Sequence, residues 1–486
     1  MGHDLRKRVP RPLGLLLVCA ALLSAAWAFF TPPWQGPDET MHYGYVESLA
    51  QRHARPGLEK GQLFSSQQRL SMRASNADKL ISISNGRPQW SKAEADRYDD
   101  RAQDAPTGNG GGARKGSYNL ARNNPPTFYV LELPAYAAGS VHGGVNARLY
   151  LMRLATILSL LATIVGVWLL VGELVGRNRS SQLAGAASVG LLPMATHLGS
   201  TVSPDSLMYA FWTFVLWLGV RALKRGFEPR VVTALVVTTV GAVLTKGTSV
   251  ALVPPVLGVL AYGLWHSPRL RERVSDLRAR KGHLLAVFVA GTAVAALMLV
   301  GGFARYSSQL SAQLQGEIAP KEMASYLWQF YLPRPGFLAD FSTVKGIPVY
   351  DVWLKDLAGN FAWLQIQQPD WLYAVLGLTT VAVIVVGGIT LWRDQPRSVV
   401  LFLAAVVGVL IAGLHLTDYQ QGVKTGVGFM QGRYLLPVAG VFAGLVAASW
   451  SRLPAHRRPA ATAIVLGALL ALQVVSFSRA AGFWYV

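Results

Sequence analysis

Long apolar runs separated by short polar connectors dominate the chain from end to end. The first covers 13–30, and later runs of spanning length lie at 149–171, 181–198, 206–222, 283–303, 371–391, 399–416, 434–450 and 460–478. An apolar run of about 20 residues can cross a bilayer as a helix. Residues 231–265 predict two further spans that turn near Thr245-Lys246-Gly247-Thr248. The pattern predicts an all-α polytopic membrane protein with about eleven transmembrane helices.

Composition agrees with this class and excludes an ordinary soluble domain. Hydrophobic residues make up 52% of the 486 positions and charged residues only 14%. The net charge of +20 would suggest nucleic acid as the partner of a soluble chain, but here much of the basic excess lies in short connectors. That distribution is the positive-inside pattern of membrane proteins, so membrane lipids and no nucleic acid are expected as partners.

The first apolar run is interpreted as a retained span. Basic residues precede it and small residues stand near its end, as in a signal peptide, but about 18 apolar residues are long for such a segment. The single cysteine, Cys19, lies within the run and excludes an internal disulfide. Val18 stands directly before it, where a lipoprotein signal needs a small residue.

The short apolar segment 126–141 decides the orientation of the chain. It is apolar but short, and Glu132 and Pro134 interrupt it, so its residues alone fit either a span or a helix that lies along the membrane surface or re-enters. The charges decide in favour of a juxtamembrane helix. With that interpretation the basic connectors fall on the side of the N-terminus, whereas a spanning segment would place them outside. We therefore predict a multi-pass protein of the bacterial cytoplasmic membrane, with a cytoplasmic N-terminus and an external C-terminus.

This topology divides the chain into five parts. They are the cytoplasmic N-terminus and first span (1–30), a first external loop with juxtamembrane helices (31–148), spans two to seven (149–303), a second external loop (304–370) and the four C-terminal spans (371–486). A third, short external loop is expected at 417–433. The first loop contains the glycine-rich tip 107–112, interpreted as a hinge because the order Lys115-Gly116-Ser117 does not fit a P-loop.

Two adjacent carboxylates, Asp38 and Glu39, follow the first span in Pro37-Asp38-Glu39. Acidic residues at a membrane edge favour a functional site unless they are solvated or paired. The alternative is a helix start, because proline and acids both suit a first helical turn. Adjacent helical residues point about 100° apart, so Glu39 is expected to orient a neighbour or bind an ion rather than share an atom with Asp38. His42 would lie on the same face as Asp38 and either pairs with it or plays a structural role.

Further charged residues stand at the edges of spans or within them. Asp205, after Ser203-Pro204, is either a second acidic residue of a site or part of a helix cap. Lys246 at the hairpin turn needs an anionic partner or access to water. Arg433 directly precedes a span, where it would either snorkel to the headgroups or bind an anion. Arg153 lies inside an apolar run, and Glu132 is the partner proposed for it.

Motifs in a fixed order resemble those of the GT-C membrane glycosyltransferases. These are Pro37-Asp38-Glu39 with His42, Asn124-Pro125-Pro126-Thr127-Phe128-Tyr129, and Ser203-Pro204-Asp205. Thr245-Lys246, Tyr331-Leu332-Pro333-Arg334 and Gln431-Gly432-Arg433-Tyr434-Leu435-Leu436-Pro437 are similar to a bacterial family of GT-C-like predicted membrane proteins of unknown function. The chain lacks Asp-x-Asp and Gly-x-Gly-x-x-Gly motifs and shows no matching broken helices of a transporter repeat.

The resemblance implies transfer of a sugar from a polyprenyl-phosphate donor to a glycan, lipid or protein acceptor of the cell envelope, polysaccharide included. It implies that Asp38 is the base, with Glu39 beside it, and that Asp205 and His42 form the acceptor or second acidic site. Arg433, Lys246 and Arg334 would hold the donor phosphate, because cations let a phosphate leave without a proton. Tyr331 and Trp328 either wall the acceptor entrance or belong to an interfacial aromatic belt.

Three questions stay open at this point. No cofactor is required by these motifs, but a divalent metal ion at Asp205 or Glu39 is an alternative. A transporter or flippase for lipid-linked saccharides would use the same basic groups without chemistry. An assembly factor for envelope polysaccharide would use the first loop to dock a partner.

Overall fold

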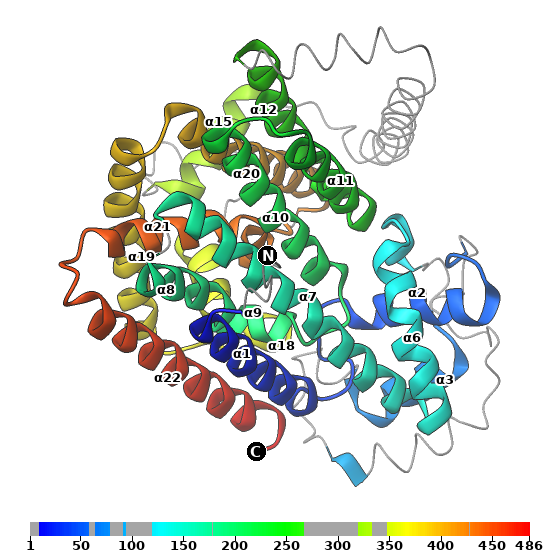
Figure 1. Ribbon diagram of the computed structural model, residues 1–486. Helices are drawn as coiled ribbons and strands as arrows, with labels where there is room; N and C mark the ends of the chain where they lie inside the picture. The colour runs from blue at the N-terminus through cyan, green and yellow to red at the C-terminus, as the bar shows by residue number, and fades with distance from the viewer. Residues whose placement is uncertain are drawn as a thin grey trace, which may run out of the picture.

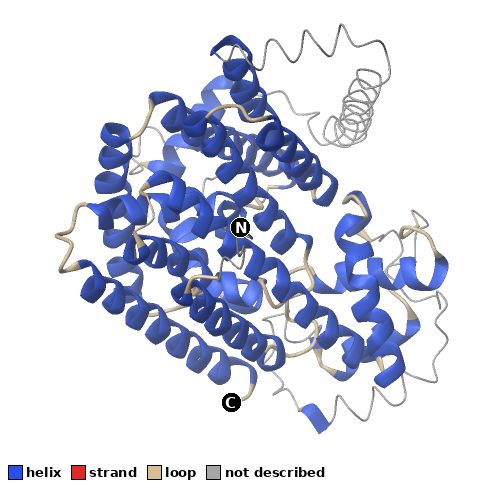
Figure 2. Cartoon of the chain, in the orientation of Figure 1, coloured by secondary structure: helices blue, strands red, loops and turns tan. Residues whose placement is uncertain are grey.

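The computed structural model describes residues 9–57, 64–77, 91–93, 119–176, 178–266, 319–332, 348–426 and 428–486. These residues form helices joined by turns, and no β-strand occurs among them (Figures 1 and 2). The all-α architecture predicted from the apolar runs is confirmed. Arg334, the glycine-rich tip at 107–112 and the predicted span 283–303 lie outside the described residues.

The principal helices follow one another in chain order as listed here. They are α1 (Arg11–Phe30), α2 (Glu39–Arg52), α3 (Ser66–Ala74), α6 (Thr127–His142), α7 (Val145–Leu174), α8 (Arg179–Gly190), α9 (Pro193–Leu198), α10 (Pro204–Arg225), α11 (Pro229–Thr245), α12 (Val253–His266), α15 (Pro320–Tyr331), α17 (Lys355–Gly359), α18 (Phe361–Leu364), α19 (Asp370–Asp394), α20 (Arg397–Thr425), α21 (Ala439–Ser451) and α22 (Arg458–Trp484). Short non-α turns stand at η1 (Leu120–Asn123), η2 (Gly247–Leu252), η3 (Tyr350–Leu354) and η4 (Gly432–Val438).

Eight helices in the described part of the chain are long and apolar enough to cross a membrane. They include α1, α7, α10, α19, α20 and α22, and the continuous pairs η2–α12 and η4–α21. Helix α11, with 17 residues, is apolar but shorter. The predicted hairpin is present, because α11 ends at Thr245 and η2 begins at Gly247.

The predicted span 181–198 is not one continuous helix. It is divided into α8 and the short α9, with Leu192 in an extended conformation between them. Pro193 has no backbone N–H to continue the ladder of α8, but its fixed φ suits the first position of a new helix. The break explains why this segment is not among the eight candidate spans.

Helix α6 has the length of a juxtamembrane helix. Its 16 residues fall short of the about 20 that a perpendicular span needs. It packs on α2 and α7, and α2, α3 and α6 lie together beside α7 at the right of Figure 1. Their shared core is rich in aromatic side chains, including Trp34, Tyr43, Tyr45 and Tyr129.

Basic side chains gather where the ends of several long helices meet. Arg221 and Arg225 near the end of α10 both pair with Glu173 at the end of α7. Lys224 donates to Gln395, which follows α19, and Arg452 after α21 pairs with Asp394. We call this the basic end of the bundle. The opposite ends of α10 and α11 carry Asp205 and Lys246.

A buried arginine fixes the chain as it leaves the first span. Arg153 is fully buried and uses all five of its N–H donors. Nε and Nη2 bind the two oxygens of Glu39 at 2.8 and 2.6 Å, and the remaining donors bind the carbonyls of Ala28, Thr31 and Pro32 at 2.7 to 3.0 Å. The partner proposed from the sequence, Glu132, is wrong, since its carboxylate bonds with Thr156 instead.

Arg153→Leu is expected to lower the free energy of unfolding by about 3 to 5 kcal/mol, because it leaves the Glu39 carboxylate buried without its cation. Arg221→Leu is the matched control, and it should cost about 1 kcal/mol or less, since Arg221 is partly exposed. Thermal unfolding of the purified proteins compares the two. Equal shifts in midpoint would contradict the anchoring role of Arg153.

Candidate active site

Five side chains from distant parts of the sequence converge at the end of the bundle opposite the basic end. Arg433 Nη2 lies 2.8 Å from Asp38 Oδ2, although 395 positions separate the two residues. Lys246 forms a second ion pair with Asp205. His42 lies close enough to all four charges to interact with them electrostatically. The structure therefore brings together five of the seven residues predicted for the site.

Asp38 does not act as a helix cap. It stands directly before α2 in the left-handed conformation, with φ of 57°, and its side chain makes no capping hydrogen bond. Aspartate is one of the few residues besides glycine that tolerate this region. Its carboxylate turns to Arg433 and stays 47% exposed, so a substrate can reach it. The alternative, in which Asp38 serves only to start helix α2, is therefore not supported by the position of its side chain.

Charge keeps Asp38 ionised. Burial of the carboxyl raises its pKa, but the Arg433 guanidinium, with smaller contributions from His42 and Lys246, outweighs burial and lowers the pKa below its ordinary value. The group is therefore a carboxylate at neutral pH, the form that accepts a proton. Its basicity is correspondingly modest, which suits a base that acts on a hydroxyl only as that hydroxyl reacts.

His42 is neutral and held by a tyrosine. Its Nδ1 lies 3.0 Å from the Tyr129 hydroxyl, which also accepts a hydrogen bond from Asn124 Nδ2 at 3.0 Å. Burial lowers the pKa of His42 to about 4. The Tyr129 ring stacks on Tyr45 at a centroid distance of 3.7 Å. Through Tyr129, Asn124 of the motif Asn124–Tyr129 is connected to His42 and so to the site.

Asp205 was expected either to be a second acidic residue of the site or to be part of a helix cap, and the structure assigns the cap to Ser203. Ser203 caps α10, since its hydroxyl accepts from the Asp205 N–H at 3.3 Å. The Asp205 side chain is 5% exposed and binds Lys246, which is 19% exposed at the end of α11. Lys246 thus has the anionic partner that its position requires.

Arg433 is buried rather than extended to a lipid surface. It opens the turn η4, and its side chain is only 10% exposed. Besides Asp38, the guanidinium contacts Tyr434, whose ring centroid lies 5.3 Å away. Within the described residues its Nε has no hydrogen-bond partner. A buried guanidinium with a free donor is suited to an oxyanion.

Glu39 lies next to the site and holds neighbouring segments of the chain in place. Both carboxylate oxygens bind Arg153, and Oε1 also accepts from the Val202 N–H at 3.3 Å. It thereby ties the segment that carries Asp38 to the turn that carries Asp205. Gly36 permits this approach, since a Cβ there would lie 2.8 Å from Thr201 Cγ2. This placement favours the orienting role predicted for Glu39.

Two aspartates that sequence reasoning missed hold the loop before Arg433. Asp418 Oδ1 accepts from the N–H groups of Phe429 and Met430 at 2.6 and 2.8 Å. Asp356 Oδ2 accepts from the N–H of Gly432 at 2.9 Å. Neither aspartate stands in a recognisable motif. The only sequence signal was the position of Asp418 just after the predicted span 399–416, the kind of signal already used for Asp38 and Asp205.

Tyr331 takes part in a polar cluster rather than facing open space. Its hydroxyl lies 2.7 Å from His415 Nε2, and Tyr326 bonds with His415 Nδ1 and with Asp418 at 2.6 Å. Helix α15 is thereby connected to α20 and to the loop held by Asp418. The ring of Tyr331 also packs against Trp353. Its predicted contact with an acceptor stays a prediction.

No group of three or more histidine, cysteine, aspartate or glutamate side chains in the described ranges is arranged to hold a metal ion. Asp205 and Glu39, the two residues considered for an ion, are both engaged by basic side chains.

A family model described as "Predicted membrane protein (DUF2142)" matches residues 21–442. The chain belongs to this family. The resemblance to GT-C-like predicted membrane proteins noted from the sequence is thus confirmed. A search of curated proteins found no match.

Solved structures show the fold of this family member. The oligosaccharyltransferase of Archaeoglobus fulgidus, tethered with an acceptor peptide containing the NVT sequon, matches with a TM-score of 0.50 and 15% identity, over 96% of this chain and 55% of that one. ArnT from Cupriavidus metallidurans in the apo state matches with a TM-score of 0.44 and 15% sequence identity, over 93% of this chain and 62% of that one. The chain thus spans little more than half the length of these proteins. The GT-C-like helical fold is confirmed, while the count of eleven spans is not.

Asp418→Asn is expected to speed amide exchange of Phe429 and Met430 by about tenfold, because two hydrogen bonds to a charged acceptor are weakened. Hydrogen–deuterium exchange with mass spectrometry of the segment around residues 428–433 measures this. Asp394→Asn, a half-exposed carboxylate at the basic end, is the control and should leave that segment unchanged. Unchanged exchange in Asp418→Asn would show that the loop is held by other contacts.

Proposed function

We propose that this protein is a membrane glycosyltransferase that transfers a sugar from a polyprenyl-phosphate-linked donor to an envelope acceptor at the outer face of the cytoplasmic membrane. The observation that carries the proposal is the Asp38–Arg433 pair. An accessible, ionised carboxylate lies 2.8 Å from a buried guanidinium that has a free donor. One group can take a proton while the other stabilises a departing phosphate.

Asp38 would act on the acceptor hydroxyl. As the hydroxyl oxygen forms its bond to the anomeric carbon of the donor, its proton passes to the Asp38 carboxylate. The bond between the anomeric carbon and the phosphate oxygen breaks, and the electron pair leaves with the phosphate. The exposed fraction of Asp38 supplies access for the hydroxyl, and the low pKa of Asp38 ensures that it is ionised beforehand.

The leaving phosphate would be stabilised by the two cations of the site. Arg433 can offer Nε, which has no partner among the described residues, together with Nη2. Lys246 would exchange part of its contact with Asp205 for a phosphate oxygen. The two carboxylates of the site balance its two cations. During transfer the phosphate gains one negative charge as it leaves and Asp38 gains one proton, so the net charge of the site with its bound groups stays the same. His42 is neutral and adds no further positive charge.

The distribution of charge supports an external site. The N-terminal end of α1 and the Arg221, Arg225 and Arg452 pairs lie at the opposite end of the bundle from Asp38. By the positive-inside rule the basic end is cytoplasmic, which puts the site outside. Tyr485 near the C-terminus bonds with the Phe30 carbonyl at the site end, in accord with an external C-terminus.

The substitution Asp38→Asn distinguishes the proposed enzyme from the two alternatives, a transporter and an assembly factor. The substitution keeps shape and the left-handed backbone but removes the base, so transfer should fall by about 100-fold or more while donor binding persists. Envelope glycans and polyprenyl-phosphate sugars are compared by mass spectrometry in cells with wild type, a deletion or Asp38→Asn at equal protein level. One glycan should lose a sugar, and its lipid-linked donor should accumulate.

Asp394→Asn provides the matched control for this comparison, because it alters a half-exposed aspartate at the basic end. It should resemble wild type. If Asp38→Asn also resembles wild type, Asp38 is not the base and transport or assembly becomes the better explanation.

The pH dependence of transfer distinguishes the effect of the Arg433 charge from the effect of its planar shape. Arg433→Met removes the main cation that lowers the pKa of Asp38, so this pKa rises and the acidic limb of the pH–rate profile moves to higher pH. Arg433→Lys keeps the charge and should leave the limb near its wild-type position, while the loss of the planar fork raises the KM for donor. Identical profiles in all three proteins would contradict the coupling of Arg433 to the base.

A further inference from the structure

A chain of hydrogen bonds leads from α15 to the loop before Arg433. The Tyr326 hydroxyl lies 2.6 Å from Asp418 Oδ2 and 3.1 Å from His415 Nδ1. The other ring nitrogen of His415, Nε2, lies 2.7 Å from the Tyr331 hydroxyl. Tyr326, His415 and Asp418 are all buried. The four side chains therefore form one continuous polar path between α15 and α20.

The direction of each hydrogen bond in this path follows from the chemistry of the groups. A carboxylate only accepts, so the Tyr326 hydroxyl gives its single hydrogen to Asp418. The Tyr326 oxygen is then an acceptor, and a hydrogen on Nδ1 of His415 fills it. In a neutral imidazole the second nitrogen must then accept, which matches a donating Tyr331 hydroxyl. The path thus has one consistent set of donors, and it fixes the tautomer of His415.

Asp418 joins this path to the loop. Its other oxygen, Oδ1, accepts from the N–H groups of Phe429 and Met430. Gly428 lets the carboxylate come this close, because a Cβ at that position would lie 2.8 Å from Oδ1. One carboxylate therefore receives a donor from α15 on one oxygen and two donors from the loop on the other.

The loop contacts Arg433 through two aromatic rings. The ring centroids of Phe429 and Tyr434 lie 5.6 Å apart, and the Tyr434 ring lies 5.3 Å from Cζ of Arg433. The same guanidinium binds Asp38. A displacement of Phe429 would therefore reach the side chain that lies against the base, with a physical contact at every step.

Core packing alone does not require these polar groups. Buried polar atoms cost free energy unless they are hydrogen-bonded, and apolar side chains of similar size would fill the same space without that cost. Here both nitrogens of His415, both oxygens of Asp418 and the Tyr326 hydroxyl all have partners. A fully satisfied network of this kind specifies a single arrangement of its members.

We propose that Tyr326 is a positioning residue for Arg433, acting through Asp418, and that His415 holds the Tyr326 hydroxyl in the required orientation. The importance of this path for transfer rests on the proposed function, whereas the path itself does not. Helix α15 belongs to the predicted second external loop, so the path makes the position of Arg433 depend on the docking of an external helix.

Tyr326→Phe tests the path with two measurements on the full chain in nanodiscs. Hydrogen–deuterium exchange of residues 428–433 should become about threefold faster, because the carboxylate that binds this loop loses one of its donors. The carboxyl ¹³C signal of Asp38, assigned by its absence in Asp38→Asn, should titrate at higher pH. A less firmly held Arg433 lowers the pKa of Asp38 less, while His42 and Lys246, the other charged or titratable groups near Asp38, are unchanged.

Two substitutions of His415 test the direction of the hydrogen bonds. His415→Asn keeps an N–H donor near the place of Nδ1, whereas His415→Gln keeps a polar group only near the place of Nε2. Because the proposed path uses Nδ1 to hold Tyr326, His415→Asn should stay closer to wild type in both measurements. Equal effects of the two substitutions would show that the ring acts by packing alone.

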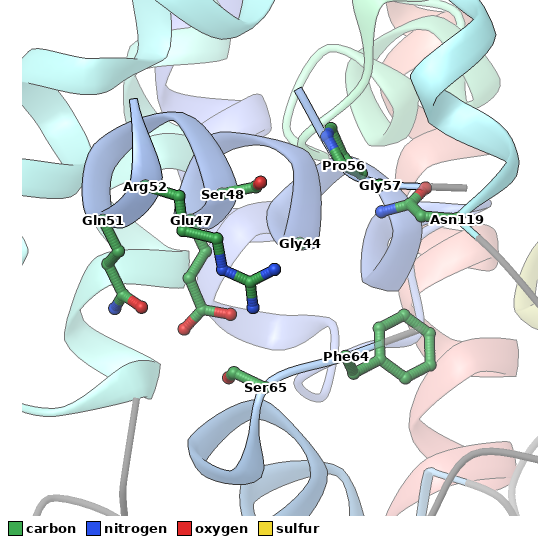
Figure 3. A pocket seen from close by; sticks show the side chains of 10 residues that line it. All are labelled: Gly44, Glu47, Ser48, Gln51, Arg52, Pro56, Gly57, Phe64, Ser65 and Asn119. Atoms are coloured by element: carbon green, nitrogen blue, oxygen red, sulfur yellow. The ribbon is translucent and has the colours of Figure 1, made fainter. Parts of the chain in front are cut away.

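Ser48→Ala is the matched control. Ser48 lies on α2 beside a pocket of about 20 Å³, which has room for about one water molecule (Figure 3). Its hydroxyl donates to the Ala54 carbonyl at 2.9 Å, so this variant also loses a hydroxyl hydrogen bond. Ser48 comes ten positions after Asp38, about 15 Å along a helix. Neither the exchange of residues 428–433 nor the titration of Asp38 should change.

The two measurements also separate this proposal from the proposed function, because neither requires transfer. Unchanged exchange in Tyr326→Phe would overturn the path. Faster exchange with an unchanged titration of Asp38 would overturn the positioning of Arg433. Full transfer activity in Asp38→Asn would instead overturn the proposed function and leave the path from Tyr326 to Arg433 standing.

Discussion

The contact between Arg153 and Glu39 is the constraint on which the candidate site depends. The Arg153 guanidinium, in the first third of α7, binds three carbonyls at and just after the end of α1 and the carboxylate of Glu39, the first residue of α2. The chain must therefore turn at this point. The same carboxylate binds the Val202 N–H. The start of α2 and the start of α10 are thereby fixed relative to each other, and each carries one acidic residue of the site, Asp38 and Asp205.

Ion pairing explains how so many charges are tolerated at the end of a membrane bundle. Each carboxylate of the site has a basic partner, and each partner comes from a different helix or turn. Pairs of this kind cost desolvation free energy and are weak evidence for stability. Here the ion pairs hold the charged side chains of the site in place. Asp418 and Asp356 likewise hold the backbone of the loop before Arg433 through hydrogen bonds.

The sequence predicted the helical class, most spans and the identity of the converging charges, because apolar length and short motifs are local properties. Pairing is not local. Glu132, 21 positions from Arg153 in the sequence, was proposed as its partner, yet the observed partner is Glu39, 114 positions away. Asp418 and Asp356 could not be predicted, since their role is to bind backbone N–H groups that carry no side-chain signature. The division of 181–198 at Pro193 was not predicted, because the prediction of a span there used only the length of the apolar run.

The backbone at Asp38 restricts which amino acids evolution can place there. A left-handed φ of 57° is readily adopted by glycine, asparagine and aspartate, and of these only aspartate has a carboxylate. Glutamate would supply the same chemical group on a backbone that disfavours it. Steric and chemical requirements thus act on one position, because asparagine or glycine would keep this backbone conformation but remove the carboxylate.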